Sequence, residues 1–294
     1  MYGSPTVTLT SVAALRAHLA PLRHTGTSVG FVPTMGALHE GHATLIREAR
    51  RGNGCAVVSI FVNPLQFDRT DDLDHYPRAL ESDVALCRTL GVDAVFAPPA
   101  SEMYPEPPEM TIQVGTLGRH LCGTSRPGHF EGVATVVLKL LQIVQPDRAY
   151  FGEKDAQQLA VLRRLVTDFN LPVEIVGIPT VREPDGLAMS SRNRRLSPAG
   201  RTAALALVRA LTAARQAIEA GERSPAAVRA MATRQVPADG TVRVDYLEVV
   251  DPRTMQPVQA VAGPVLVAGA MWVDGVRLID NLTAQPGGTP GVSA

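Results

Sequence analysis

Two histidines separated by a glutamate and a glycine lie in the segment P-T-M-G-A-L-H-E-G-H, residues 33–42. The segment follows a short apolar run and precedes a helix-forming stretch, so His39 and His42 fall where a helix begins. The unbonded N–H groups of a helix N-terminus attract anions, and Gly36 and Gly41 let the backbone approach a ligand. One well-placed hydrogen-bond donor stabilises a charged transition state by about 3–4 kcal/mol. The pattern therefore indicates a phosphate site, with ordinary helix-capping histidines as the alternative.

The same two histidines also invite comparison with a metal site. The sequence H-E-G-H is one residue shorter than the H-E-x-x-H pattern of zinc proteases, and no third ligand stands out in the sequence. We therefore expect no metal ion bound by the side chains of the chain itself.

Two further polar segments contain groups that suit phosphate binding. In F-G-E-K-D, residues 151–155, Lys154 can hold phosphate charge, and Asp155 can cap a helix, bind Mg²⁺ through water or orient a ligand. In M-S-S-R-N, residues 189–193, two hydroxyls and a guanidinium suit a flap that closes on a triphosphate. A solvated linker is the alternative for this last segment.

Two glutamines accompany these segments. Gln66 follows the apolar run C-A-V-V-S-I-F-V, and Gln158 lies one turn into the helix expected after Asp155. Both can hydrogen-bond an oxygen-rich ligand without adding charge. Each, taken singly, also fits an exposed surface amide.

The stretches that must position these residues alternate between strand and helix patterns. We expect strands at 29–32, 55–62, 94–97, 148–151 and 173–181, and helices at 44–51, 79–90, 133–144 and 155–169. This alternation predicts βαβ units and a mostly parallel sheet. The loops that follow the strands of such a sheet meet at one edge, where ligands bind.

The pattern changes after Arg182. Helices are expected at 198–220 and after Pro225, and strands at 242–250, 263–270 and 276–279, with Asp274-Gly275 as a hairpin turn. We expect a nucleotide-binding domain at 1–182, a smaller α+β domain at 183–284 and a disordered tail at 285–294.

Composition narrows the classes of partner. The 28 basic and 28 acidic residues give a net charge of zero, so there is no positive surplus for a nucleic acid. No apolar run approaches the roughly 20 residues of a membrane span, and no signal-peptide pattern is visible. The three cysteines are odd in number and far apart, which favours small packing residues over disulfides. We expect a cytoplasmic globular protein that acts on small molecules.

Taken in order, several segments resemble the motifs of the pantothenate synthetase family, the ATP-dependent pantoate–β-alanine ligases. They are V-P-T-M-G-A-L-H-E-G-H, V-S-I-F-V-N-P-L-Q-F, H-Y-P-R, L-K-L-L-Q-I-V-Q-P-D-R-A-Y-F-G-E-K-D-A-Q-Q-L and D-G-L-A-M-S-S-R-N-R. The resemblance runs from about Thr27 to beyond Leu196 and is weaker in the C-terminal part. The H-x-G-H motif also marks the wider nucleotidyltransferase superfamily, which includes class I aminoacyl-tRNA synthetases. Their K-M-S-K-S loop is similar to M-S-S-R.

The resemblance implies an α/β fold, with a Rossmann-like parallel-sheet N-terminal domain and a smaller α+β C-terminal lid, in a homodimer. It also implies a two-step reaction of coenzyme A biosynthesis. The carboxylate of pantoate attacks the α-phosphate of ATP, giving pantoyl adenylate and pyrophosphate, and the amine of β-alanine then displaces AMP. ATP is thus expected as a substrate, accompanied by Mg²⁺.

The resemblance assigns residues to this reaction. His42 matches the proton donor of the family, with His39, Lys154 and Arg192 as further catalytic groups. The expected ATP contacts are Met35, Gly36, His39, Gly41, His42, Gly152, Glu153, Lys154, Asp155, Val181, Met189, Ser190, Ser191 and Arg192. The expected contacts to pantoate and β-alanine are Gln66, Gln158, Pro33, Phe151, Val136 and Val137. Arg126 and His129 match a polar cluster near this pocket. Arg195 departs from the family, which commonly has an aromatic residue there.

Three other functions remain open at this stage. A nucleotidyltransferase of the same superfamily would retain AMP in a stable diester, and only the two glutamines and the apolar wall argue against it. An aminoacyl-tRNA synthetase fits poorly, because there is no charge surplus for tRNA and the C-terminal third is short for an anticodon-reading module. A non-catalytic nucleotide-binding protein is disfavoured because every charged site position is filled.

Overall fold

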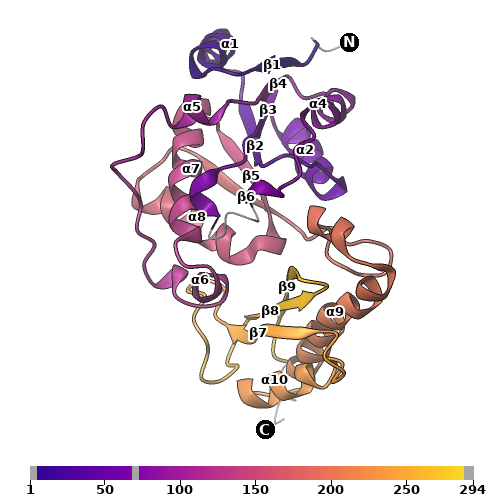
Figure 1. Cartoon of the computed structure of the whole chain (residues 1–294). Helices are drawn as coiled ribbons and strands as arrows, with labels where there is room; N and C mark the ends of the chain where they lie inside the picture. The colour runs from indigo at the N-terminus through magenta and orange to yellow at the C-terminus, as the bar shows by residue number, and fades with distance from the viewer. Residues whose placement is uncertain (1–4, 68–72, 288–294) are drawn as a thin grey trace. The chain divides into compact units, whose positions relative to one another are not determined.

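The computed structural model describes residues 5–67 and 73–287, and the chain forms two compact units (Figure 1). The first unit comprises 1–114, 126–153 and 161–179, and the second comprises 115–125, 154–160 and 180–294. The segments of the two units alternate along the chain. The single boundary expected at residue 182 stays a prediction. Most of the expected tail, residues 288–294, lies outside the described residues.

The first unit contains a six-stranded parallel sheet, as the alternating pattern predicts. Its strands run in the order β1-β4-β3-β2-β5-β6. Their bounds are β1 Val7–Leu9, β2 Val29–Thr34, β3 Cys55–Ile60, β4 Ala94–Phe96, β5 Arg148–Gly152 and β6 Glu174–Ile178. The first five residues of β3 are all buried, which is why its sequence is nearly continuously apolar.

Helices cover both faces of this sheet. They are α1 Val12–His24, α2 Glu40–Gly52, α4 Leu80–Thr89, the short α5 Ala100–Met103, α7 His129–Val144 and α8 Ala156–Asp168. Leu45 and Ile46 of α2 pack with Val84 and Cys87 of α4 against one face. In Figure 1, α7 lies on the other side of the sheet from α2, and α1 packs beside α7.

The order of the strands reverses between β2 and β5. These two strands are neighbours, with Gly30 opposite Arg148 and Phe31 opposite Ala149. From β2 the chain proceeds outward through β3 to β4 on one side, and from β5 to β6 on the other. Ligands of open α/β sheets bind beyond the carboxyl ends of the strands at such a switch point. The H-E-G-H segment leaves β2, and the G-E-K-D segment leaves β5.

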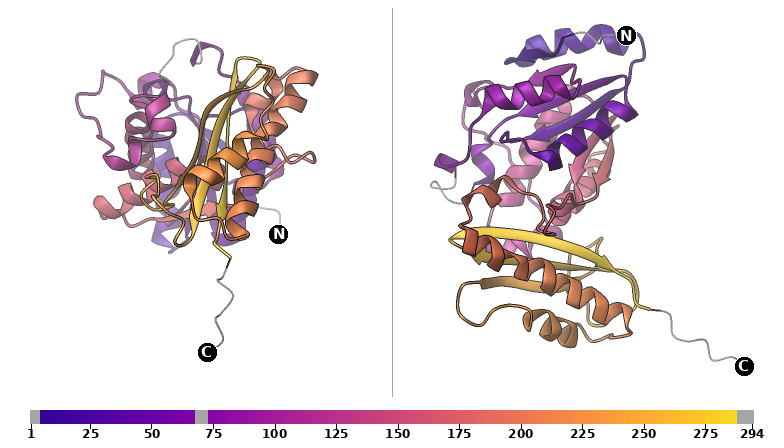
Figure 2. Two further views of the ribbon diagram at one scale, coloured as in Figure 1. Left: turned by 90° about the horizontal axis from the view of Figure 1, so that it is seen from below. Right: turned by 90° about the vertical axis from the view of Figure 1, so that its right-hand side faces the viewer.

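The second unit contains a separate three-stranded antiparallel sheet in the order β7-β8-β9. Its main elements are α9 Pro198–Glu219, α10 Pro225–Thr233, β7 Arg243–Val250, β8 Val265–Val273 and β9 Val276–Ala284. The two helices pack beside each other on the sheet (Figure 2). Asp274 and Gly275 have φ values of 52° and 71°, so the expected tight turn between β8 and β9 is confirmed. The parallel sheet and this smaller domain together confirm the predicted α/β class.

Several expected boundaries are wrong. β1 and α1 were not expected, β3 ends at Ile60 rather than Val62, and β6 ends at Ile178, just before Pro179. β8 and β9 are longer than expected and end at Val273 and Ala284. Within 5–67 and 73–287, no helix has the length and apolarity needed to cross a membrane.

The three cysteines are free and buried, as their sequence context predicts. Burial raises the pKa of both Cys55 and Cys87 to about 12. Since only the thiolate is nucleophilic, we expect both to react with iodoacetamide at pH 8 about 10³-fold more slowly in the folded than in the unfolded protein. Mass spectrometry of the labelled peptides measures this ratio. Labelling of either thiol at the unfolded rate would contradict the burial.

Candidate active site

The two histidines lie at the first turn of α2 and bond to its backbone. The N-cap residue His39 accepts the N–H of Gly41 at Nδ1 over 3.1 Å, and the N–H of His39 is donated to Nδ1 of His42 over 3.3 Å. The two ring centroids are 4.1 Å apart. Because each ring accepts through Nδ1, this bonding pattern assigns the hydrogen of the neutral ring to Nε2. The histidines thus cap the helix and also carry an N–H donor on the other ring nitrogen.

Glu40, between the two histidines, is paired with Arg47 on the same helix. The hydrogen bond from Arg47 holds the pKa of Glu40 below its usual value. Glu40 is therefore an ionised surface partner of Arg47.

Gln66 is held inside the first unit by side chains on both of its amide atoms. It ends the short helical turn Pro64–Gln66 that follows β3, and it is buried. Its Nε2 contacts the sulfur of Met35 at 2.8 Å, and its Oε1 accepts from Asn63 at 3.2 Å. Asn63 in turn accepts from the hydroxyl of Tyr104 at 2.9 Å. Asn63 and Tyr104 were not expected in this cluster, and no local pattern in the sequence links them to Gln66.

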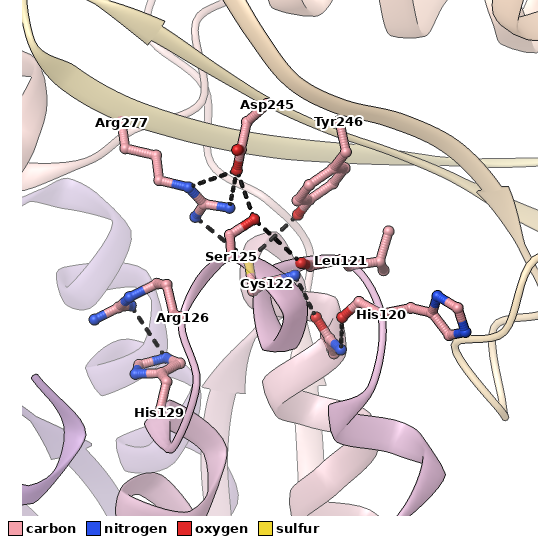
Figure 3. Close-up of polar contacts among 10 residues, drawn as sticks. His120, Leu121, Cys122, Ser125, Arg126, His129, Asp245, Tyr246 and Arg277 are labelled. Atoms are coloured by element: carbon pink, nitrogen blue, oxygen red, sulfur yellow. Dashed lines mark hydrogen bonds and ion pairs between the residues drawn. The ribbon is translucent and has the colours of Figure 1, made fainter. Parts of the chain in front are cut away.

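Arg126 and His129 bind the backbone carbonyl of the same glutamine. His129 Nδ1 lies 2.8 Å from the carbonyl oxygen of Gln66, and Arg126 donates to that oxygen over 3.2 Å. Arg126 also lies 3.2 Å from Nε2 of His129 (Figure 3). Nearby, Gly132 of α7 packs so closely that a Cβ there would lie 2.2 Å from the carbonyl oxygen of Leu65. The first turn of α7 therefore fixes the position of Gln66.

If Gln66 binds pantoate, as the family resemblance implies, removing the hydrogen-bond donor of His129 should weaken pantoate binding. We expect His129→Leu to raise the KM for pantoate about tenfold, which corresponds to the roughly 1–1.5 kcal/mol of a poorly satisfied buried carbonyl. His129→Asn places an amide N–H near the former Nδ1 and should restore most of the loss. Steady-state kinetics with pantoate varied at saturating ATP test this. Equal KM values for the wild type and His129→Leu would contradict the role of the ring.

The expected apolar wall belongs to three elements of the first unit. Val136 and Val137 of α7 and Phe151 of β5 are buried, and Pro33 of β2 is half-buried. At the end of β5, a Cβ added to Gly152 would meet no atom within 4 Å. The backbone there is open to close approach.

Glu153, directly after β5, is exposed and is the last residue of this part of the first unit, and the expected residues that follow it belong to the second unit. Lys154, Asp155 and Gln158 are half-buried, and the carbonyl of Lys154 accepts from Asn281 over 2.9 Å. The neighbouring Gln157 has a structural role. It is buried, accepts the N–H of Cys122 and donates to the carbonyls of Leu117 and His120.

The M-S-S-R segment is held in place and is not a loose linker. A short antiparallel pairing joins Arg182 to Ala188, and the N–H of Met189 bonds to the carbonyl of Val181 over 2.9 Å. Ser190 then caps the short helix Ser191–Arg195 by accepting the N–H of Arg192. The expected site residues 181 and 189–192 therefore lie together in one folded segment.

Ion pairs fix this segment within the second unit. Arg182 binds both carboxylate oxygens of the buried Asp280 over 2.7 and 3.0 Å. Arg201 pairs with Glu183 and Asp185. Burial alone would raise the pKa of Glu183, but hydrogen bonds from Arg201 and Asn193 hold it below its usual value. Arg195, where the family commonly has an aromatic residue, is exposed at the end of this segment.

A second polar cluster anchors the short helix α6 Cys122–Ser125 to the antiparallel sheet (Figure 3). Asp245 accepts hydrogen bonds from Ser125 and Arg277 at 2.8 Å each. Cys122 lies 3.3 Å from the hydroxyl of Tyr246, and burial raises the pKa of that phenol well above its usual value. Cys122 is thus buried as expected, but it is hydrogen-bonded rather than purely a packing residue.

Among residues 5–67 and 73–287, no group of three or more His, Cys, Asp or Glu side chains is arranged to hold a metal ion. The two histidines of α2 use their Nδ1 atoms for the helix cap.

A parallel sheet with a histidine-capped helix at its switch point defines an α/β protein built to hold a phosphorylated ligand. Comparison with known proteins gives the family. The model of the family described as pantoate-beta-alanine ligase matches residues 7–283. The chain belongs to the pantoate–β-alanine ligase family, whose members are ATP-dependent enzymes that join pantoate to β-alanine.

Individual relatives are similar to this chain over nearly its whole length. The pantothenate synthetase of Moorella thermoacetica is 52% identical over 94% of this chain and 98% of its own. A crystal structure of pantothenate synthetase from Thermus thermophilus has a TM-score of 0.90 and 49% identity, covering 95% of this chain and 99% of its own. The Francisella tularensis enzyme, described as complexed with β-γ ATP and β-alanine, has a TM-score of 0.77 and 33% identity over 94% and 97% of the two chains.

Proposed function

We propose that the chain makes pantothenate in two steps through a pantoyl adenylate. In the first step a carboxylate oxygen of pantoate forms a bond to the α-phosphorus of ATP, and the bond to the β-phosphate oxygen breaks, releasing pyrophosphate. In the second step the neutral amine of β-alanine attacks the acyl carbon, AMP leaves, and the amine loses a proton. The family membership and the ligands named for the Francisella enzyme support this proposal.

The H-E-G-H segment provides donors for the first step. Charge builds up on the phosphate oxygens as the pentacovalent transition state forms, and the Nε2–H groups of His39 and His42 stabilise that charge. Lys154, Ser190 and Arg192 neutralise the departing pyrophosphate. The other proposed ATP contacts are Met35, Gly36, Gly41, Gly152, Glu153, Asp155, Val181, Met189 and Ser191.

Gln66 and Gln158 bind the hydroxyl and carboxylate of pantoate, and Gln66 also serves β-alanine. In the structure Nε2 of Gln66 contacts a thioether, which is a weak acceptor. A substrate oxygen replaces that sulfur at little cost. Pro33, Val136, Val137 and Phe151 surround the gem-dimethyl group.

Mg²⁺ arrives with ATP in this proposal. The described residues offer no cluster of three ligands, and Mg²⁺ in nucleotide sites commonly takes most of its ligands from phosphates and water. Asp155, the carboxylate that directly follows Lys154, fits a single, water-mediated contact. When bound, the ion neutralises triphosphate charge.

Cellular location and assembly are also part of the proposal. Three free, buried thiols are typical of a protein of the reducing cytoplasm. The homodimer is proposed on the family resemblance. Light scattering of the purified protein, which measures the mass of the assembly, tests it.

The proposal is tested by analysing products. Incubation with ATP, (R)-pantoate and β-alanine should yield AMP, pyrophosphate and pantothenate in equal amounts. A product that keeps AMP as a stable diester would instead favour a nucleotidyltransferase. Tight ATP binding with no turnover of pantoate would favour a non-catalytic nucleotide-binding protein.

A further inference from the structure

A buried carboxylate, Asp83, bonds to the loop that leads into the two histidines. One of its oxygens accepts the N–H of Ala37 and the other accepts the N–H of Leu38, each over 2.8 Å. The residue is 3% exposed and lies in the first turn of α4. Leu38 directly precedes His39, so Asp83 holds the backbone up to the residue before the helix cap.

The loop held by Asp83 has an unusual backbone. Gly36 and Ala37 are consecutive left-handed residues, with φ of 82° and 51°. Alanine disfavours this region, so the conformation persists only where the surroundings impose it. Asp83 provides this restraint on one side of the loop. Thr34 provides it on the other, accepting the N–H of Gly36 and donating to the carbonyl of Ser59.

The fit between Asp83 and the loop is close. A Cβ on Gly36 would lie 2.9 Å from Oδ2 of Asp83 and 3.1 Å from Cγ2 of Ile60. Ala37 and Leu38 are themselves buried, at 3% and 7% exposure. Without the carboxylate, two buried N–H groups would lose their acceptor, and the loop would leave its left-handed conformation to pair them elsewhere.

We propose that Asp83 is a positioning residue for His39 and His42. Both of its oxygens are occupied by backbone N–H groups, so it acts through the loop and not on the substrate. By fixing residues 36–38, it sets the point at which α2 begins and therefore where the two Nε2–H donors lie. The inference rests on the proposed function, because it assigns Asp83 to the step that those histidines serve.

The main test compares Asp83→Asn with Glu81→Gln. Asparagine keeps the size but retains one acceptor oxygen and turns an NH₂ group toward a backbone N–H. Glu81 is an exposed carboxylate in the same first turn of α4, so its replacement is matched in charge. We expect Asp83→Asn to lower kcat for pantoate-dependent pyrophosphate exchange about 10²-fold, the cost of a small misplacement of catalytic groups, with KM for pantoate nearly unchanged. Glu81→Gln should leave kcat unchanged.

Two double variants distinguish a positioning role of Asp83 from a general effect on stability. In a His42→Ala background, Asp83→Asn should cost much less than in the wild type, because one donor that it positions is already gone. In an Ala37→Gly background, Asp83→Asn should also lower kcat less than in the wild type, because glycine adopts positive φ without strain. The second pair also keeps the test available if Asp83→Asn alone fails to fold.

Equal costs of Asp83→Asn in all three backgrounds, or an effect no larger than that of Glu81→Gln, would overturn the positioning role. A readout without turnover distinguishes this from failure of the proposed function. Asp83→Asn should shift the ¹⁵N resonances of the His39 and His42 rings, and Glu81→Gln should not. If the wild type shows no pantoate-dependent exchange, the proposed function fails while the ring shifts still report on Asp83.

Discussion

Replacing His42 by alanine is expected to lower the rate of pantoyl adenylate formation about 10²–10³-fold, the usual cost of removing one well-placed donor to a developing oxyanion. The same change should lower the free energy of unfolding by only about 1 kcal/mol. His42 accepts the N–H of His39 at a half-exposed helix end, and loss of a cap has that typical size. Single-turnover adenylation and urea unfolding measure the two quantities.

His42→Asn separates the two roles of the ring. The asparagine oxygen can accept the N–H of His39 as Nδ1 does, but asparagine does not reach to the position of Nε2. We expect this variant to be about as stable as the wild type and nearly as slow as His42→Ala. Losses of rate and stability that rise together across the two variants would contradict a catalytic role.

Replacing Asp280 by alanine is expected to lower the free energy of unfolding more than replacing His42 does. Its side chain is 2% exposed and binds Arg182, which precedes the M-S-S-R segment in the chain. Removing one partner of a buried ion pair leaves the other charge unpaired, at a cost of about 3–5 kcal/mol. Because Arg182 is 25% exposed, we expect the lower end of this range in the free energy of unfolding.

Glu248→Ala is the matched control for Asp280→Ala. Glu248 lies on the same antiparallel sheet and pairs with Arg229, but both side chains reach solvent, at 29% and 44% exposure. Exposed pairs contribute at most about 1 kcal/mol. If urea unfolding gave the two variants the same stability, Asp280 would not anchor the segment.

Local patterns in the sequence predict the helices and strands of the first unit that carry the candidate site residues. The continuous apolar run of β3 indicates a buried strand, and the glycines around His39 indicate a helix start. Both inferences need only neighbouring residues. The three-residue β1 is too short to show a period, and α1 carries an internal proline at Pro21, which breaks its helical pattern.

Contacts between distant residues could not be predicted in this way. The expected strand at 276–279 stops before Asp280 and Asn281, because two polar residues end an apolar pattern. In the structure β9 continues through them, since Arg182 pairs with the buried Asp280. The same limit applies to Asp83, whose two backbone partners lie more than 40 positions earlier in the chain. Their pairing depends on the folded sheet and leaves no local signal.

The most direct test of the two-step account is pyrophosphate exchange. The protein is incubated with ATP, Mg²⁺ and labelled pyrophosphate, with and without (R)-pantoate, and without β-alanine. If pantoyl adenylate forms reversibly, label should enter ATP only when pantoate is present. An absence of exchange with pantoate, or exchange that requires β-alanine, would contradict an adenylate formed before the amine reacts.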